Sequence, residues 1–208
     1  MPAYYTWAFT DCIYYYKQAQ PATQAAASKY NFKLPFAGGH SWICTAQAND
    51  PGDSGHQGDN YYSLDFVRSG WPKVNQDVDV FAMHGGKVVE VFSGPLDSTK
   101  GASYGGFPAN GFFVRVDMDG DNNKKTGFVT VYCHLKYPPM WRVGDTIKAG
   151  DWVGYMGTTG HSTGEHLHLT FKYDGNGQYP QSEVEKVLIE GIGIRSFRTG
   201  KTYTSTRS

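Results

Sequence analysis

The sequence has little charge of either sign, few cysteines and no long apolar run, and each shortage excludes a class of protein. Its 208 residues contain 19 Lys+Arg and 19 Asp+Glu, which gives a formal net charge of zero. A neutral chain has no general attraction to nucleic acid or to an anionic membrane surface, so we expect neither as a partner. No stretch approaches the roughly 18 apolar residues that a membrane span requires.

Only three cysteines are present, and no two of them form a C-x-x-C pair. This argues against a cysteine metal cluster and against a dithiol redox motif. If the chain is secreted, the expected disulfide is Cys12–Cys44, whereas Cys133 lies in an apolar run and is expected to be a buried thiol. The first basic residue is Lys17, so the N-terminus does not read as a signal peptide. Either the protein stays inside the cell or the chain is a mature form.

Glycine and aromatic residues are abundant, with 26 Gly and an aromatic content of 15%. This composition favours short β-strands joined by tight turns. We therefore predict a mainly β fold built on an antiparallel sheet. The β-type runs cover 63–67, 78–92, 112–116, 128–132, 152–156 and 167–173, and only 181–189 looks helical. Residues 1–32 are expected to form an N-terminal extension or linker, and residues 33–208 the folded domain.

Two of the seven histidines, His166 and His168, are separated by a single residue. In a strand, residues i and i+2 point to the same face, so the two imidazoles would lie side by side. Leu167 and Leu169 would then point into a core. The alternative interpretation of this pair is two surface histidines on an exposed face of a strand.

A carboxylate and two further histidines complete a candidate metal site. Asp65 lies in a β-type run between apolar neighbours, which is unusual unless it is paired or ligating. His56 stands in the loop before it, with His40 as a more distant rival, and His134 follows another run. Zinc in catalytic sites takes three such ligands and leaves a fourth position for water.

These residues resemble the motifs of the lysostaphin-type zinc metallopeptidases, family M23, and most closely those of the LasA-like branch. The matching segments are His56, Ser63-Leu64-Asp65-Phe66, Tyr132-Cys133-His134-Leu135 and Gly164-Glu165-His166-Leu167-His168. The resemblance covers roughly residues 33–204. It implies the antiparallel β domain of that family, with long loops walling a groove.

The resemblance also implies a site and a reaction. One Zn²⁺ per chain would be held by His56, Asp65 and His168. His166 would be the general base and His134 would position the water or stabilise the developing oxyanion; spacing alone does not say whether His166 or His168 is the ligand. The implied substrate is a peptide cross-link of bacterial peptidoglycan, often with Gly-containing bonds, cut by a secreted or periplasmic monomer in mature form.

A groove for such peptides would be walled by aromatic and imidazole side chains, and Tyr203 could assist the transition state. The expected wall residues are Tyr61, Tyr62, Trp71, Tyr104, Phe107, Trp141 and His161. Two alternatives stay open: a catalytically silent domain that binds peptidoglycan or activates an amidase, and a zinc protease acting on other Gly-rich proteins.

Three further patterns are assigned structural roles. The segment 117–123 is rich in aspartate, but its glycine is fourth and Phe128 stands at position 12, which departs from an EF-hand loop. We predict a solvated hairpin turn there. The G-x-S-x-G pattern at 160–164 lacks a following helix and a later histidine, so it is not a serine nucleophile elbow. His84 is expected to be a structural residue.

Overall fold

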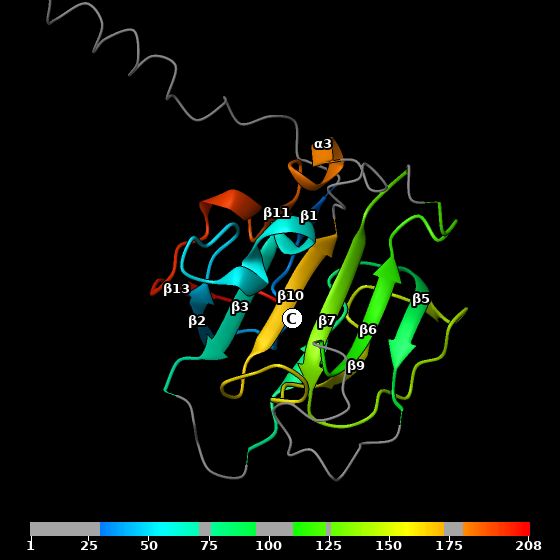
Figure 1. Cartoon of the computed structure of the whole chain (residues 1–208), viewed down its shortest axis with the longest axis horizontal. Helices are drawn as coiled ribbons and strands as arrows, with labels where there is room; N and C mark the ends of the chain where they lie inside the picture. The colour runs from blue at the N-terminus through cyan, green and yellow to red at the C-terminus, as the bar shows by residue number, and fades with distance from the viewer. Residues whose placement is uncertain (1–29, 71–75, 95–109, 124–125, 173–180) are drawn as a thin grey trace, which may run out of the picture.

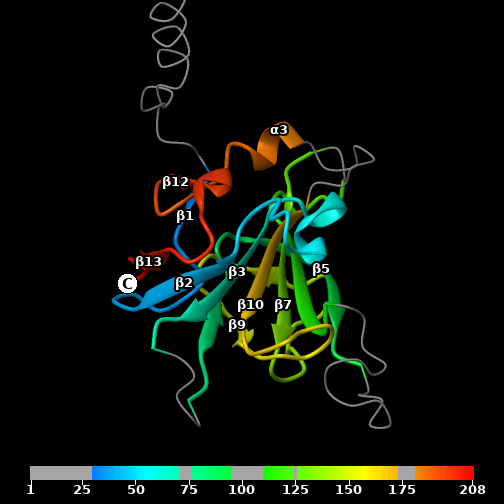
Figure 2. The same cartoon turned by 60° about the vertical axis from the view of Figure 1, so that its left-hand side comes forward.

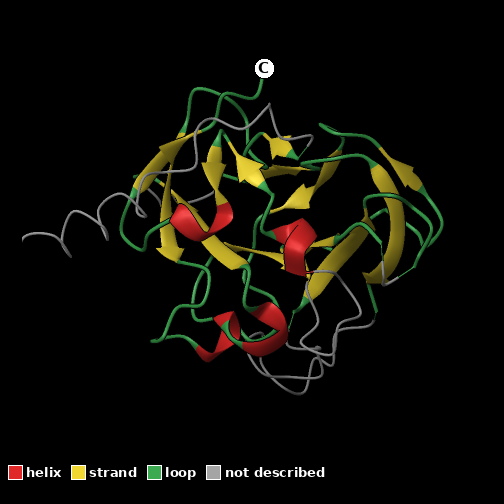
Figure 3. Cartoon of the chain, turned by 90° about the horizontal axis from the view of Figure 1, so that it is seen from above, coloured by secondary structure: helices red, strands yellow, loops and turns green. Residues whose placement is uncertain are grey.

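The computed structural model describes residues 30–70, 76–94, 110–123, 126–172 and 181–208. Strands are the main regular element in this part of the chain, and the helical segments are short turns (Figure 3). The prediction of a mainly β, antiparallel fold is confirmed.

The largest unit is an eight-stranded sheet in which all neighbouring strands are antiparallel (Figure 1). Its order across the sheet is β13 (Thr202–Thr204), β2 (Ser41–Ala46), β3 (Ser63–Arg68), β10 (Leu167–Lys172), β7 (Val129–Leu135), β6 (Phe112–Asp117), β5 (Gly86–Phe92) and β8 (Thr146–Ile147). The central strands β3, β10 and β7 lie side by side in both side views (Figures 1 and 2).

Two small sheets and four helical turns complete the described structure. One sheet pairs β4 (Asp79–Phe81) with β9 (Trp152–Tyr155), and the other contains β1 (Asn31–Phe32), β11 (Leu188–Ile189) and β12 (Ile192–Gly193). The turns are η1 (Ser54–His56), η2 (Gly58–Asn60), α3 (Gln181–Val184) and η3 (Ile194–Ser196). None of the helices in the described ranges is long and apolar enough to cross a membrane.

Alternation in β3 and β10 separates a core face from a face that carries polar residues. Leu64 and Phe66 of β3 and Leu167 and Leu169 of β10 are fully buried in the main core. Burying each such side chain contributes about 1.5–3 kcal/mol, which holds the two strands in register. The residues between them therefore face the other side of the sheet together.

Two predicted elements were wrong in their extent. The run 78–92 contains two strands in different sheets, β4 and β5, because Ala82 leaves the ladder and exchanges backbone hydrogen bonds with Asp151 and Gly150. The helix predicted over 181–189 ends after Val184. Its last two residues form β11, which pairs in parallel with β1 and so gains hydrogen bonds that a helix would not supply.

The cysteine predictions have different outcomes. Cys133 is a buried thiol, as predicted, and burial raises its pKa to about 12. Cys44 is also fully buried, and its thiol donates a hydrogen bond to the Ala46 carbonyl oxygen. Cys12 lies outside the described residues, so the Cys12–Cys44 disulfide stays a prediction, as does the division into 1–32 and 33–208.

Candidate metal centre

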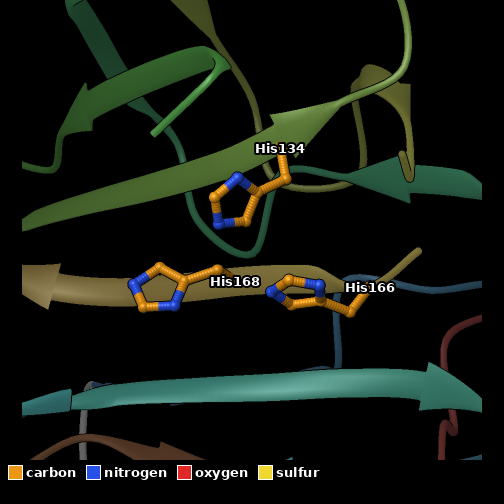
Figure 4. A group of neighbouring side chains, drawn as sticks. All are labelled: His134, His166 and His168. Carbon is orange, nitrogen blue, oxygen red and sulfur yellow. The ribbon is translucent and has the colours of Figure 1, made fainter. Parts of the chain in front are cut away.

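The polar face of the central strands brings together histidine and aspartate side chains from distant parts of the sequence. His168 on β10 lies directly opposite Asp65 on β3 and Cys133 on β7. His166, just before β10, shares the face of His168, and the imidazole of His134 extends from β7 toward both (Figure 4). The ring centroid of His134 lies 4.8 Å from that of His166 and 5.7 Å from that of His168.

A β-bulge in β7 aims His134 at this group. Phe112 pairs with Leu135 and Val114 with Tyr132, so β7 carries one extra residue between these pairs. His134 takes a left-handed φ of 59°, which is uncommon for a residue with a side chain. Simple alternation would place His134 on the face opposite Cys133, in the core. Bulges of this kind re-aim side chains beside active sites, and here the bulge returns His134 to the polar face.

His56 is buried with one ring nitrogen left without a hydrogen bond. Its Nδ1 lies 3.0 Å from the Ser63 carbonyl oxygen and 3.1 Å from that of Gln47, so Nδ1 carries the proton and donates it. Nε2 is buried, makes no hydrogen bond, and faces Oδ2 of Asp65 at 3.2 Å. Two acceptors at this distance require a proton or a cation between them, and a metal ion satisfies both.

His168 contacts the second carboxylate oxygen of Asp65. Its Nδ1 lies 2.8 Å from Asp65 Oδ1, and its Nε2 lies 2.8 Å from the Thr170 hydroxyl, which is itself 2.8 Å from the Ser63 hydroxyl. When Nε2 donates to Thr170, Nδ1 is free to bind a metal beside the carboxylate. An outer hydrogen bond of this kind sets the tautomer and the orientation of a ligating imidazole.

Electrostatics in the group favour a charged carboxylate. Burial by itself would raise the pKa of Asp65, but the hydrogen bond with His168 and the contact with His56 hold it well below its usual range. Burial opposes the protonation of His56, yet Asp65 raises the pKa of His56 overall. Asp65 is therefore anionic at neutral pH, as a carboxylate ligand of a metal ion must be.

The two remaining imidazoles also point an unprotonated nitrogen at the group. Nδ1 of His134 donates to the Thr159 carbonyl oxygen at 2.7 Å, and Nδ1 of His166 donates to that of Gly164 at 2.8 Å. Burial, followed by the nearby His166 and His168, lowers the pKa of His134 to about 3. His134 is thus neutral at neutral pH, with Nε2 as an acceptor.

Two overlapping sets of three residues could hold a metal ion. In each set, one ligand atom per residue lies within 4.8 Å of the others, and the sets are His56, Asp65 and His168, and His134, His166 and His168. Nitrogen ligands with one carboxylate are typical of catalytic zinc. The unsatisfied Nε2 of His56 belongs to the first set, and the donors present there fit zinc.

The group lies in a pocket of about 370 Å³ whose lining is polar. All five predicted site residues line it, and the other lining residues are Asp53, Gly55, Asn60, Asn110, His161, Ser162 and Thr163. His161 is thus found where it was expected.

The predicted aromatic wall is wrong for the residues that the structure describes. Tyr62 is fully buried in the core, and neither Tyr61 nor Trp141 lines the pocket. Trp141 packs against the core instead, and its Nε1 donates to the Trp152 carbonyl oxygen. Aromatic bulk contributes more free energy in the core than at a polar rim, which explains the error. Trp71, Tyr104 and Phe107 lie outside the described residues.

Three other residues named in the sequence analysis, His40, His84 and Tyr203, lie outside the pocket. His40 is exposed beside Arg68, so it does not compete with His56. His84 is buried and contacts the Thr130 hydroxyl, in keeping with a structural role. Tyr203 packs on Phe197 at 4.4 Å between ring centroids and does not reach the lining.

Sequence reasoning missed the residues that orient the imidazoles. Thr170 and Ser63 are two positions from His168 and Asp65 on their strands, so period-2 alternation had the signal to identify both. The sequence contains no signal for the backbone carbonyl groups of Gln47 and Thr159 that accept from His56 and His134, because every residue type has a carbonyl group.

Comparison with known proteins gives a consistent family. Residues 72–180, just over half of the chain, match peptidase family M23. The chain is 33% identical to glycyl-glycine endopeptidase ALE-1 of Staphylococcus capitis over 115 residues, which is 55% of this chain and 25% of that protein. It is 34% identical to lysostaphin of Staphylococcus simulans over 92 residues, which is 44% of this chain and 17% of that protein. The chain thus spans a quarter or less of the length of these curated relatives.

The fold is also similar to that of a solved structure. The M23 metalloprotease pseudoalterin from the deep sea superposes with a TM-score of 0.52 at 21% identity, over 86% of this chain and 97% of that one. The matched segment of the family contains His134, His166 and His168, whereas His56 and Asp65 precede it. On the extent of that match, the chain belongs to peptidase family M23.

Proposed function

We propose that this chain is a zinc-dependent endopeptidase that hydrolyses peptide cross-links of bacterial peptidoglycan, with a preference for Gly-containing bonds. Family membership supports the metallopeptidase class. The names of two relatives, glycyl-glycine endopeptidase and lysostaphin, support the substrate. We place the chain in the LasA-like branch on its sequence motifs alone. A substrate in the cell wall makes it a secreted or periplasmic protein.

The observation that carries the proposal is the buried Nε2 of His56. It has no hydrogen-bond partner and faces the Asp65 carboxylate at 3.2 Å. We assign His56, Asp65 and His168 as the ligands of one zinc ion, because this set pairs that nitrogen with a carboxylate. A zinc ion with an open fourth position supplies a water of pKa about 7 and polarises a substrate carbonyl.

Two histidines of the chain, His166 and His134, are assigned to the attacking water and its proton. His166 is assigned as the general base, because its Nδ1 is committed to Gly164 and its Nε2 lies 3.6 Å from Asp65 Oδ2, beside the ligands. His134 presents an unprotonated Nε2, and its lowered pKa keeps it neutral. That state supports accepting a hydrogen bond from the attacking water rather than donating one to an oxyanion.

The polar lining supports a substrate recognised through its backbone. Asn60, Asn110 and Thr163 offer side-chain donors and acceptors along the pocket. Peptides rich in glycine have few side chains to bind, so hydrogen bonds to the main chain supply most of their recognition.

The test is the release of new amino termini from purified cell walls. Gly-bridged and directly cross-linked peptidoglycan would be treated with the zinc-loaded protein, with the chelated protein, and with chelated protein to which zinc has been restored. We expect the zinc-loaded protein to release amino termini from the Gly-bridged wall. The chelator should abolish this release, and restored zinc should recover it. Release from the directly cross-linked wall alone would overturn the Gly preference. No release from either wall, with stoichiometric zinc bound, would favour a catalytically silent wall-binding or activator domain.

A further inference from the structure

A second acidic group lies in the loop that joins β6 to β7, away from the histidines. Asp117 ends β6, and one carboxylate oxygen from each of Asp117, Asp119 and Asp121 lies within 4.8 Å of the others. The hairpin turn predicted here is confirmed by the antiparallel pairing of β6 and β7. The expectation that it is solvated is wrong for Asp117, whose exposed fraction is 1%.

Asp117 has a buried oxygen with no partner. Its Oδ2 accepts a hydrogen bond from the Asn122 backbone N–H at 2.7 Å, while its Oδ1 is buried and makes no hydrogen bond. An unpaired charged oxygen in this position is costly, with a typical penalty of several kcal/mol. The other two side chains of the group are carboxylates and cannot donate to this oxygen unless protonated, whereas a cation would satisfy it.

No described cation neutralises the group. Among the residues with assigned positions, no lysine or arginine forms an ion pair with any of the three aspartates. Burial and the neighbouring Asp119 and Asp121 carboxylates raise the pKa of Asp117 to about 6. The three carboxylates therefore repel one another at neutral pH unless a cation lies between them.

We propose that Asp117, Asp119 and Asp121 form a calcium site, with Asp117 Oδ1 as its buried ligand. Calcium binds six to eight oxygens at 2.3–2.6 Å, so two ligands on opposite sides of one ion are about 4.8 Å apart. The oxygens of this group are close enough to share one ion. An all-oxygen set disfavours zinc, and the exposed Asp119 and Asp121 leave room for the water ligands that calcium accepts.

The site would stabilise the hairpin rather than take part in catalysis. Asp117 is paired with Val129 at one end of β7, and His134 lies near the other end, about 17 Å along the strand. A bound ion would tie the loop to the buried end of β6. The turnover of the zinc-loaded protein should not depend on it.

The experiment uses zinc-saturated full chain, with calcium chloride compared against sodium chloride of equal ionic strength. We expect calorimetry to find one calcium per chain, and the Tm to rise by about 5 °C at a hundredfold excess over the dissociation constant. Asp119→Asn should remove both effects. Asp79→Asn, which changes an exposed aspartate outside the group, should retain them.

A second variant separates a ligand from a merely structural residue. Asp117→Asn should raise the Tm in calcium-free buffer, because it removes a repelled charge, and should lose the further rise with calcium. The proposal is overturned if calcium gives wild type no binding heat and no Tm change. It is also overturned if Asp119→Asn or Asp117→Asn keeps the full calcium-dependent rise.

Discussion

Asp65 and Asp117 are both buried aspartates on strands of the same sheet, but their surroundings have opposite effects. Imidazoles surround Asp65, with His168 at 2.8 Å and His56 at 3.2 Å, and its pKa is lowered. Carboxylates surround Asp117, and its pKa is raised to about 6. The comparison shows that burial does not decide the charge of a carboxylate, since both are buried. The neighbours that the fold places beside it do.

The two groups also differ in what they can bind. The group around Asp65 offers nitrogen together with one carboxylate, which suits zinc. The group around Asp117 offers oxygen alone, which suits a hard cation. Each carries one buried atom without a partner, Nε2 of His56 and Oδ1 of Asp117, and in each case that atom indicates where a cation would lie.

The largest expected effect comes from exchanging the two carboxylates for amides. Asp65→Asn should weaken zinc binding by more than about 100-fold, beyond the usual loss for an outer partner, and should abolish peptidoglycan hydrolysis. Asp117→Asn, the matched change, should keep both zinc and turnover. Metal analysis after dialysis and an amino-group release assay measure the two quantities. Full zinc affinity in Asp65→Asn would refute the ligand assignment.

The next effect separates the roles of the imidazoles around Asp65. His166→Ala should keep its zinc and lose turnover by about 10²–10⁴-fold, the usual contribution of a general base. His40→Ala, which removes an exposed imidazole beside Arg68, should remain fully active. If His166→Ala loses zinc together with activity, the roles of His166 and His168 must be exchanged.

A smaller effect concerns the hydroxyl behind His168. Thr170→Val removes the contact of 2.8 Å to Nε2 and should weaken zinc binding by about 10–100-fold. Thr130→Val is a matched control on the neighbouring strand, because its hydroxyl contacts His84 outside the pocket. It should lower stability and leave zinc affinity unchanged. Equal zinc affinity in the two variants would show that Thr170 does not position His168.

The smallest effect is the pH dependence of stability at Asp117. The native state holds this proton more tightly than the unfolded chain, since its pKa is raised from 3.8 to about 6. Its contribution to stability is therefore complete below pH 4 and is lost as the pH rises through 6. Urea unfolding of wild type and Asp117→Asn in calcium-free buffer should show curves that diverge over this range. Parallel curves would contradict the raised pKa.

Much of the candidate site follows from local patterns in the sequence. The alternation in Leu167–Lys172 and Ser63–Arg68 puts leucine and phenylalanine on one face and the site residues Asp65 and His168 on the other, and the structure has this arrangement. The aromatic wall could not be predicted in this way. A tyrosine such as Tyr62 suits a rim or a core equally by type, and only its packing partners decide between them.

Sequence patterns were enough to predict the strands β3, β6, β7, β9 and β10 and the side chains that could bind a metal, because side-chain direction in a regular strand depends on neighbouring residues. The tertiary structure decided which of them meet. Strand register sets His168 opposite Asp65, and a bulge turns His134 out of the core. Both depend on the summed pairing and packing of strands far apart in the chain, and the same long-range packing buries Asp117 among like charges.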